Sequence, residues 1–497
     1  MSELDSQSLG VKEQFAQQPR GVLTMFVVQL FSVMGYAYVY ALLLLLAVRV
    51  FGFGDHQAFE LTGAFNALNF ATSIFGGYLA GRFLGYRFST GVGLFVAAVA
   101  LVILLLPHHL ALYWGLSFLV CAEGMLIPSL FVLLGRLYPQ NDPRRLSGFM
   151  LIYVGINVGA FLAEASSGAI SHQLGYGYAF FLGALFMLVA LFVFLLQHRL
   201  FNGAGFAPRF AKQRPEAIKR SRLTGMCWLL ISLPVLALML HFAVLTHFFL
   251  MALGVAAVLF VLHLARLEGE MYRKRLYAFV LLLLISFVFL VFYMLIPSVL
   301  VLFTVRNVNH VIFGMRVHTT SFLALNPFFV VILGMLLVLF YLPRLRRNFR
   351  QSLPLKFTLA CFLMALSYFV LVVGIQLANV KTGLVSPWWV VGSYFLQTLA
   401  ELFVVPTSFA MIGELVPIRL EGLLMGIWLF LTGVASSTAV VCSGLIRMPA
   451  HITTPSITND LYNQAFLIYG SVIIVMALAS ALLIPFLQKL LRDPSTA

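Results

Sequence analysis

The sequence has very little charge for its length. Only 9% of its 497 residues are Asp, Glu, Lys or Arg, whereas 62% are hydrophobic. A typical soluble protein contains roughly 25% charged residues, so this composition excludes a water-soluble fold. Apolar runs long enough to cross a bilayer core of about 30 Å recur along nearly the whole sequence instead. The sequence therefore predicts a polytopic, all-α membrane protein with the lipid bilayer as its surroundings.

Cysteine is also scarce, and motifs for enzyme chemistry are missing. Cys121, Cys227, Cys361 and Cys442 all fall inside apolar runs, and none has a CxxC or metal-ligand spacing. We interpret them as small buried hydrophobic residues and expect no metal site. No Walker loop or nucleophile elbow is present. We therefore expect no enzyme activity, no cofactor and no ATP-driven pumping.

Acidic residues are few, since 16 Asp and Glu stand against 31 Lys and Arg, which gives a formal net charge of +15. The basic residues occupy short loops between apolar runs and form no basic domain, so we expect no binding to nucleic acid. With the N-terminus in the cytoplasm, 26 of the 31 basic residues lie on the cytoplasmic side. The positive-inside rule then places both termini in the cytoplasm. The location is the cell membrane, or the inner membrane of a Gram-negative bacterium.

Hydropathy predicts fourteen transmembrane helices, near residues 22–48, 57–81, 88–107, 111–135, 148–170, 178–197, 223–240, 243–264, 276–304, 320–342, 355–378, 388–413, 422–446 and 465–488. We predict a cytoplasmic tail at 1–21, a six-helix bundle at 22–200, a linker with two extra helices at 201–275, a second six-helix bundle at 276–488 and a tail at 489–497. The loop at 135–139 reads GRLYP and the loop at 413–417 reads GELVP, at matching places in the two halves. Two such halves indicate the major facilitator fold.

A short loop after the second span supports this fold. Gly77, Arg82, Gly85 and Arg87 resemble the major-facilitator loop G-x-x-x-D-R-x-x-G-x-R, with Gly81 in place of the usual Asp. Glycine permits close approach and tight turns, and the arginines remain at the cytoplasmic surface. The resemblance implies a gating loop.

Three longer stretches carry a more specific resemblance. The first is LYP at 137–139 followed by DPRR at 142–145 and GIN at 155–157. The second is RNV at 306–308 with LNPF at 325–328, and the third is QTLAEL at 397–402 with MGIW at 425–428. These motifs, over about residues 18–450, resemble the proton-dependent oligopeptide transporter (POT) family. The resemblance implies peptide:proton symport by alternating access, with solute bound near the bilayer midplane between the halves.

Several positions at which the family carries charge differ in this chain. The E-x-x-E-R positions of the first helix align with Gln29, Ser32 and Val33, a further arginine with Tyr40, and the fourth-helix lysine with Ile127. The seventh-core-helix carboxylate aligns with Met294 and the second-helix tyrosine with Phe70. The resemblance implies that solute-binding residues remain at Glu401, Asn157, Asn326, Tyr36 and Trp428, with Tyr40 and Phe70 beside them. Aromatic packing is an equal alternative for the two tyrosines, and hydrogen bonding between helices is an equal alternative for the two asparagines. In the family, basic residues hold a peptide's carboxylate and the Glu of the tenth core helix holds its amino group. In this chain the basic residues are missing, and Glu401, which would bind the amino group, remains.

Three carboxylates are candidates for proton coupling. Glu401 is the family position. Glu123 lies four residues before Ile127 and shares its helix face, and Glu164 lies seven residues after Asn157. Charges inside a membrane are costly and usually functional. The alternative for Glu123 and Glu164 is a structural hydrogen bond to a neighbouring helix.

We therefore predict a secondary transporter for di- and tripeptides or a related amine-bearing small solute, with protons as the coupling ion. One alternative is an uncoupled facilitator or exporter of a non-peptide solute. Another is a receptor-like protein without transport. The sequence predicts no oligomeric state.

Overall fold

The computed structural model of the chain describes residues 18–139, 142, 144–201, 215–345, 349–444 and 454–491. Most of the predicted N-terminal tail, the linker stretch 202–214 and the predicted C-terminal tail from 492 onward lie outside the described residues. Contacts divide the chain into two compact units. Unit 1 comprises residues 1–42 and 71–241, and unit 2 comprises residues 43–70 and 242–497. The domain boundaries stated above stay a prediction.

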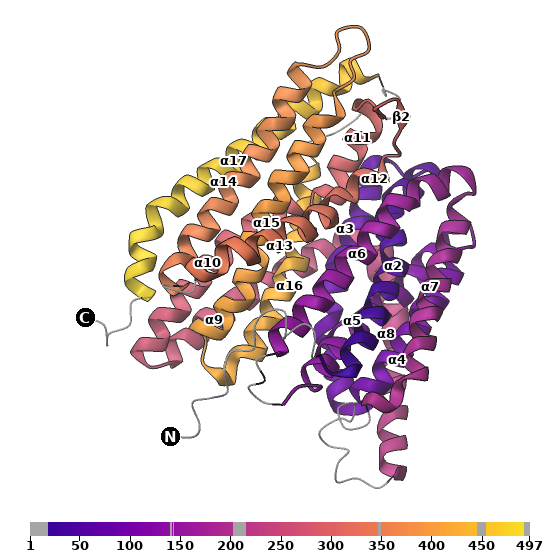
Figure 1. Cartoon of the computed structure of the whole chain (residues 1–497), viewed down its shortest axis with the longest axis vertical. Helices are drawn as coiled ribbons and strands as arrows, with labels where there is room; N and C mark the ends of the chain where they lie inside the picture. The colour runs from indigo at the N-terminus through magenta and orange to yellow at the C-terminus, as the bar shows by residue number, and fades with distance from the viewer. Residues whose placement is uncertain are drawn as a thin grey trace. The chain divides into compact units, whose positions relative to one another are not determined.

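Unit 1 is helical throughout its described part. Two helices, α2 (Arg20–Arg49) and α3 (Asp55–Leu79), contribute residues to both units. The remaining elements of unit 1 are η1 (Ala80–Leu84), α4 (Tyr86–Ile103), α5 (His109–Gly135), α6 (Arg145–Gln173), α7 (Tyr176–Leu196), η2 (His198–Phe201) and α8 (Pro215–His241) (Figure 1).

Unit 2 contains the remaining helices and one short hairpin. Its elements are α9 (Ala243–Leu267), α10 (Glu270–Tyr293), η4 (Ile296–Leu300), α11 (Val301–Asn307), β1 (Val311–Ile312), β2 (Met315–Arg316), α12 (Thr320–Leu323), α13 (Leu325–Leu345), α14 (Phe349–Gln376), α15 (Pro387–Leu415), α16 (Ile418–Ser443) and α17 (Pro455–Leu491). Figure 1 shows α17, in yellow, running alongside α14, in orange.

Helices lie at all fourteen predicted spans. In the described part of the chain, twelve helices are long and apolar enough to cross a membrane. The other two spans correspond to α3, which carries Asp55 and Glu60 near its start, and to α12 with α13. The prediction of an all-α polytopic membrane protein is therefore confirmed.

Glycine permits close crossing of α3 and α5 within unit 1. A Cβ atom at Gly76 would lie 2.2 Å from the carbonyl oxygen of Gly124. One at Gly124 would lie 2.7 Å from the hydroxyl oxygen of Thr72, which itself bonds to the backbone of α5 over 3.3 Å. Since no larger residue fits without a shift of backbone, these positions determine how closely the two helices approach.

In unit 2, the helix that begins as α10 changes its winding near its C-terminal end. α10 ends at Tyr293, the π-helical segment η4 follows with Pro297 at its start, and α11 continues the same span. Proline cannot donate a backbone hydrogen bond, which disfavours continuous α-helix. Beyond α11 lies an antiparallel hairpin in which Val311 pairs with Arg316. The sequence did not predict the π segment or the hairpin.

The two extra helices are covered by little protein. In α8, only 28% of an 18-residue apolar stretch is buried by the rest of the protein, and in α9 the corresponding share is 22%. α8 contacts α5 and η1, where the Ser221 hydroxyl donates to the backbone oxygen of Phe83 over 3.1 Å. This position corrects one prediction: Cys227 on α8 is exposed, because the protein covers only a narrow face of this helix. Cys121 and Cys361 are buried as predicted, and Cys442 is partly exposed.

Candidate functional site

Glu401 lies at the middle of α15, a helix of 29 residues, in unit 2. Its side chain is partly exposed. A carboxylate in the middle of an apolar span is costly unless it has hydrogen-bond partners or a function. Two neighbouring helices provide the partners, since α10 contributes Tyr293 and α13 contributes Asn326.

Both partners bond to the same carboxylate oxygen. The Tyr293 hydroxyl donates to Glu401 Oε2 over 2.8 Å, and the Asn326 side-chain amide donates to Oε2 over 2.8 Å. The Asn326 amide also donates to the Thr398 hydroxyl over 3.1 Å, one turn earlier on α15. These bonds connect three helices of unit 2 at one carboxylate and fix the carboxylate's orientation.

The arrangement leaves Glu401 able to accept a cationic group. Its two donors are neutral, and in the described part of the chain no Lys or Arg forms an ion pair with it. The described residues donate no hydrogen bond to Oε1. Charge-assisted hydrogen bonds between an ammonium group and a carboxylate are stronger than neutral ones. The site can therefore hold an amine through Oε1 while Oε2 stays anchored.

Trp428 and Phe70 lie elsewhere in unit 2. Trp428 on α16 is 3% exposed and packs edge-on against Phe409 of α15, with ring centroids 4.9 Å apart. In the described part its indole nitrogen has no hydrogen-bond partner. Phe70 lies against α16, where a Cβ at Gly433 would approach its Cβ to 3.1 Å. The solute-binding role predicted for both residues stays a prediction.

Unit 1 contains the predicted tyrosines and Asn157. Tyr36 and Tyr40 stack on each other along α2, with ring centroids 6.2 Å apart, and both are partly exposed. Asn157 on α6 is 7% exposed, and its amide donates to the backbone oxygen of Tyr153 over 2.9 Å. That bond lies within its own helix, so Asn157 does not join α6 to a neighbour through it. Its role in solute binding also stays a prediction.

Glu123 and Glu164 are buried in unit 1. Glu123 on α5 is 6% exposed, and its Oε1 has no hydrogen-bond partner in the described part. Glu164 on α6 is 5% exposed, and no described side chain bonds to its carboxylate. The structural alternative, a hydrogen bond to a neighbouring helix, therefore receives no support from the described residues. Their predicted part in proton coupling is untested.

The four residues of the predicted gating loop lie at the junction of α3, η1 and α4. Gly85 connects η1 to α4 with a φ of +82°, a conformation that favours glycine. Arg82 is exposed, and its guanidinium carbon lies 5.7 Å from the ring centroid of Tyr78. Arg87 is partly buried, and Gly77 lies within α3. Gating by this loop stays a prediction.

A second loop carries the first family motif, before α6. Arg144 binds Asp142 through its backbone nitrogen, Nε and Nη2 over 2.9, 3.0 and 2.8 Å. These hydrogen bonds lower the pKa of the Asp142 carboxyl below its ordinary value. Burial, followed by the charge of Asp142, raises the pKa of Tyr138 to about 12. The Tyr138 hydroxyl donates to Gln18, whose amide nitrogen donates to Ser147 over 2.8 Å, so the motif joins the start of α2 to the start of α6.

Sequence reasoning missed Tyr293, the second donor to Glu401. It directly precedes Met294, the position aligned with the family's lost carboxylate, and that adjacency was the available signal. Asn326, Thr398 and Glu401 all lay in recognised motifs, but nothing in their spacing indicated that they would meet.

A predominantly helical fold with many apolar spans and a carboxylate held between helices is typical of a membrane transporter. Comparison with known proteins specifies its family. The model of the POT family matches residues 87–459. Among curated relatives, dipeptide and tripeptide permease A of Erwinia pyrifoliae is 30% identical over 480 residues, 96% of each chain. Dipeptide and tripeptide permease B of Salmonella typhimurium is 28% identical, over 97% of this chain and 98% of its own. The chain belongs to the POT family.

Solved structures agree on the fold. A peptide transporter, POT, crystallised in complex with alafosfalin has a TM-score of 0.83 and 24% identity, covering 96% of this chain and 97% of its own. A POT family transporter in complex with 5-aminolevulinic acid has a TM-score of 0.81 and 23% identity, covering 95% and 98%. The predicted major facilitator fold is therefore confirmed.

Proposed function

We propose that this chain is a secondary transporter that carries di- and tripeptides, or a related amine-bearing small solute, across the cell membrane by alternating access. The curated relatives that span almost the whole chain are named as dipeptide and tripeptide permeases, which supports this substrate class. We further propose that protons take part through Glu401, Glu123 or Glu164. Both termini lie in the cytoplasm, in the inner membrane if the source is a Gram-negative bacterium.

The observation that carries the proposal is the partly exposed Glu401 with its open Oε1. A peptide has an ammonium group at one end and a carboxylate at the other. Here the ammonium group binds Glu401, whereas the family's basic positions align with Val33, Tyr40 and Ile127 and offer no charge to the carboxylate. The amino end therefore dominates recognition in this chain, and the carboxyl end contributes little.

The proposal makes a direct prediction about substrates. In proteoliposomes, a dipeptide and its C-terminal amide should be taken up at similar rates, because no basic side chain at the family positions binds the free carboxylate. The N-acetylated dipeptide should not be taken up, because it has no cation for Glu401. Glu401→Gln should weaken binding of the free dipeptide about ten- to a hundred-fold, the value of one lost charge-assisted bond of roughly 1.5–3 kcal/mol.

Glu270→Gln is the matched control, since Glu270 lies exposed at the start of α10 and pairs only with Lys274 among the described residues. Unchanged uptake in Glu401→Gln, or equal uptake of the N-acetylated peptide, would contradict amine recognition at this carboxylate. Counterflow without any gradient separates a transporter from a receptor-like protein, and dependence on a pH gradient separates a coupled transporter from an uncoupled facilitator.

A further inference from the structure

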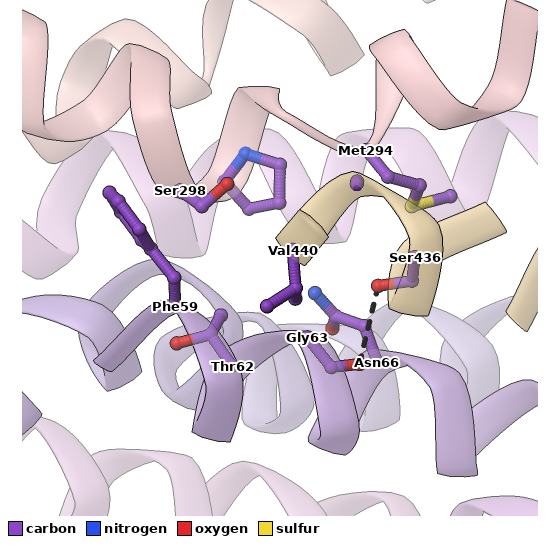
Figure 2. A pocket seen from close by; sticks show the side chains of 10 residues that line it. Phe59, Thr62, Gly63, Asn66, Met294, Ser298, Ser436 and Val440 are labelled. Atoms are coloured by element: carbon purple, nitrogen blue, oxygen red, sulfur yellow. Dashed lines mark hydrogen bonds between the residues drawn. The ribbon is translucent and has the colours of Figure 1, made fainter. Parts of the chain in front are cut away.

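The pocket shown in Figure 2, which lies in unit 2, has space for a single water molecule and no more. Its volume is about 10 Å³. The polar groups that line it, such as those of Thr62, Asn66 and Ser436, are neutral, and the Ser436 hydroxyl donates to the backbone oxygen of Gly63 over 3.3 Å. The pocket offers no charge to a solute or an ion. Charge is concentrated in unit 1 instead.

One end of unit 1 carries a group of basic side chains, called here the basic cluster. η1 packs there against the starts of α4 and α8, and α5 ends beside them. In η1, α4 and α8 and at the residue after α5 there are six Lys and Arg but only one acidic residue, Glu216. The cluster therefore keeps a positive charge even when Glu216 pairs with one member. The six are Arg82, Arg87, Arg136, Lys219, Arg220 and Arg222.

The extra helix α8 brings Arg222 to the predicted gating loop. Arg222 Nε donates to the backbone oxygen of Leu84 over 3.3 Å, and the guanidinium carbon lies 4.8 Å from the ring centroid of Phe88. Arg87 lies close enough for its charge to repel that of Arg222. Both side chains are partly buried, so water screens this repulsion incompletely. A negatively charged group between the two guanidinium groups replaces the repulsion by attraction.

The loop itself brings no carboxylate to its arginines. Gly81 stands where the major-facilitator loop has Asp, and the hydroxyl oxygen of Tyr86 lies 2.9 Å from the place of a Cβ atom at Gly81. Arg136 lies over the same ring, with its guanidinium carbon 4.7 Å from the Tyr86 centroid. A neutral phenol therefore fills the space beside Gly81, and a negative charge has to come from a ligand.

Lipid can reach the basic cluster because the protein covers only a narrow face of α8. Leu223, which directly follows Arg222, is 66% exposed, and Trp228 on the same helix is 48% exposed. An anionic phospholipid matches both features, since its phosphate suits guanidinium groups and its acyl chains suit exposed apolar side chains. A free phosphate ion matches only the first. In other membrane proteins, basic pockets between helices bind the headgroups of anionic lipids.

We propose that the basic cluster binds the headgroup of an anionic phospholipid, with the phosphate between Arg87 and Arg222. A guanidinium group binds phosphate through two parallel hydrogen bonds, and its fixed geometry makes it well suited to this ligand. Lys219 lies three residues before Arg222, on the same face of α8, and adds to the attraction for negative charge. The bound lipid holds α8 against η1 and the start of α4.

The site is tested by thermal unfolding of the purified full-length protein in detergent, with added phosphatidylglycerol, phosphatidylcholine or inorganic phosphate at one ionic strength and pH. We expect a saturable rise in Tm with phosphatidylglycerol alone, because a ligand that binds only the folded state stabilises it. Arg87→Gln and Arg222→Gln should each raise the half-saturating concentration about five-fold, which corresponds to about 1 kcal/mol. Native mass spectrometry, which counts the lipid molecules retained by the folded protein, checks the binding without unfolding.

Arg266→Gln is the matched control, since Arg266 is exposed in the last turn of α9, the other extra helix, and its loss removes the same charge outside the cluster. Arg222→Glu places a carboxylate beside Arg87, so it should abolish the response to phosphatidylglycerol. The unchanged protein's discrimination among the three additives decides the site even if a variant folds poorly. Equal stabilisation by phosphatidylcholine or inorganic phosphate, an undiminished response in Arg222→Glu, or an equal shift in Arg266→Gln would overturn the site.

Because Arg87 belongs to the predicted gating loop, the bound lipid also links membrane composition to that loop. This role rests on the proposed function, whereas the binding site does not. Dipeptide counterflow in phosphatidylcholine liposomes should rise when phosphatidylglycerol is added, and it should rise less in Arg222→Gln than in Arg266→Gln. Equal counterflow with and without phosphatidylglycerol overturns this role and leaves the binding site standing. Absence of counterflow in both lipids overturns the proposed function instead.

Discussion

Tyr293 and Asn326 both donate a hydrogen bond to Oε2 of Glu401, and among the described residues none donates to Oε1 of this partly exposed side chain. If a lysine or arginine were the partner, the carboxylate would already be paired and a solute amine would have to compete with it. Neutral donors orient the group and keep its charge available. The hydrogen bonds from Asn326 and Tyr293 orient the Glu401 carboxylate, so we expect a change at either residue to affect amine binding. Direct binding of solute by Asn326 stays a prediction.

Tyr293→Phe tests this positioning role. The change removes the bond to Oε2 and retains the ring, which stacks on Phe289 at 5.9 Å. Loss of one hydrogen bond of about 0.5–1.5 kcal/mol should weaken dipeptide binding roughly two- to twelve-fold. Tyr272→Phe, on the same helix and away from Glu401, should bind as the unchanged protein does. Dissociation constants from thermal shifts measure both. An equal loss in Tyr272→Phe would contradict the positioning role.

At the scale of helices, hydropathy predicted the spans because every spanning segment must bury about 20 residues of apolar surface. It did not predict features decided by only a few residues. The hairpin depends on Phe313 and Gly314, which both adopt positive φ, and η4 depends on Pro297. The contact of Tyr293 with Glu401 depends on how α10, α13 and α15 pack. No one-dimensional pattern records such packing, although family motifs identified Glu401 and Asn326 themselves.

The crossing of α3 and α5 provides a prediction at this scale. Gly76→Ala places a Cβ against the backbone of Gly124, which cannot move as a side chain tip can. Overpacking of this kind costs about 1–3 kcal/mol, so the Tm in detergent should fall. Gly177→Ala on α7, where nothing lies within 4 Å of the added Cβ, should leave it nearly unchanged. Equal Tm values for the two variants would show that α3 and α5 can separate at no cost.

At the scale of the whole molecule, charge rather than packing determines orientation. The excess of Lys and Arg falls in alternate loops, and the membrane potential and the insertion machinery favour such loops in the cytoplasm. In unit 2 this rule assigns opposite sides to the start of α10, which carries Lys274, and to the loop between α14 and α15, which carries Lys381. Both lysines are exposed, so both positions are open to chemical labelling.

The orientation is testable in a protein whose exposed Cys227 and partly exposed Cys442 are replaced by serine. Lys381→Cys should react with a membrane-impermeant maleimide added to intact cells, because the distribution of basic residues predicts that its loop faces outward. Lys274→Cys should react only after the membrane is permeabilised. Cys361, which is buried, provides the unreactive reference. Reaction of Lys274→Cys in intact cells, with Lys381→Cys protected, would invert the topology.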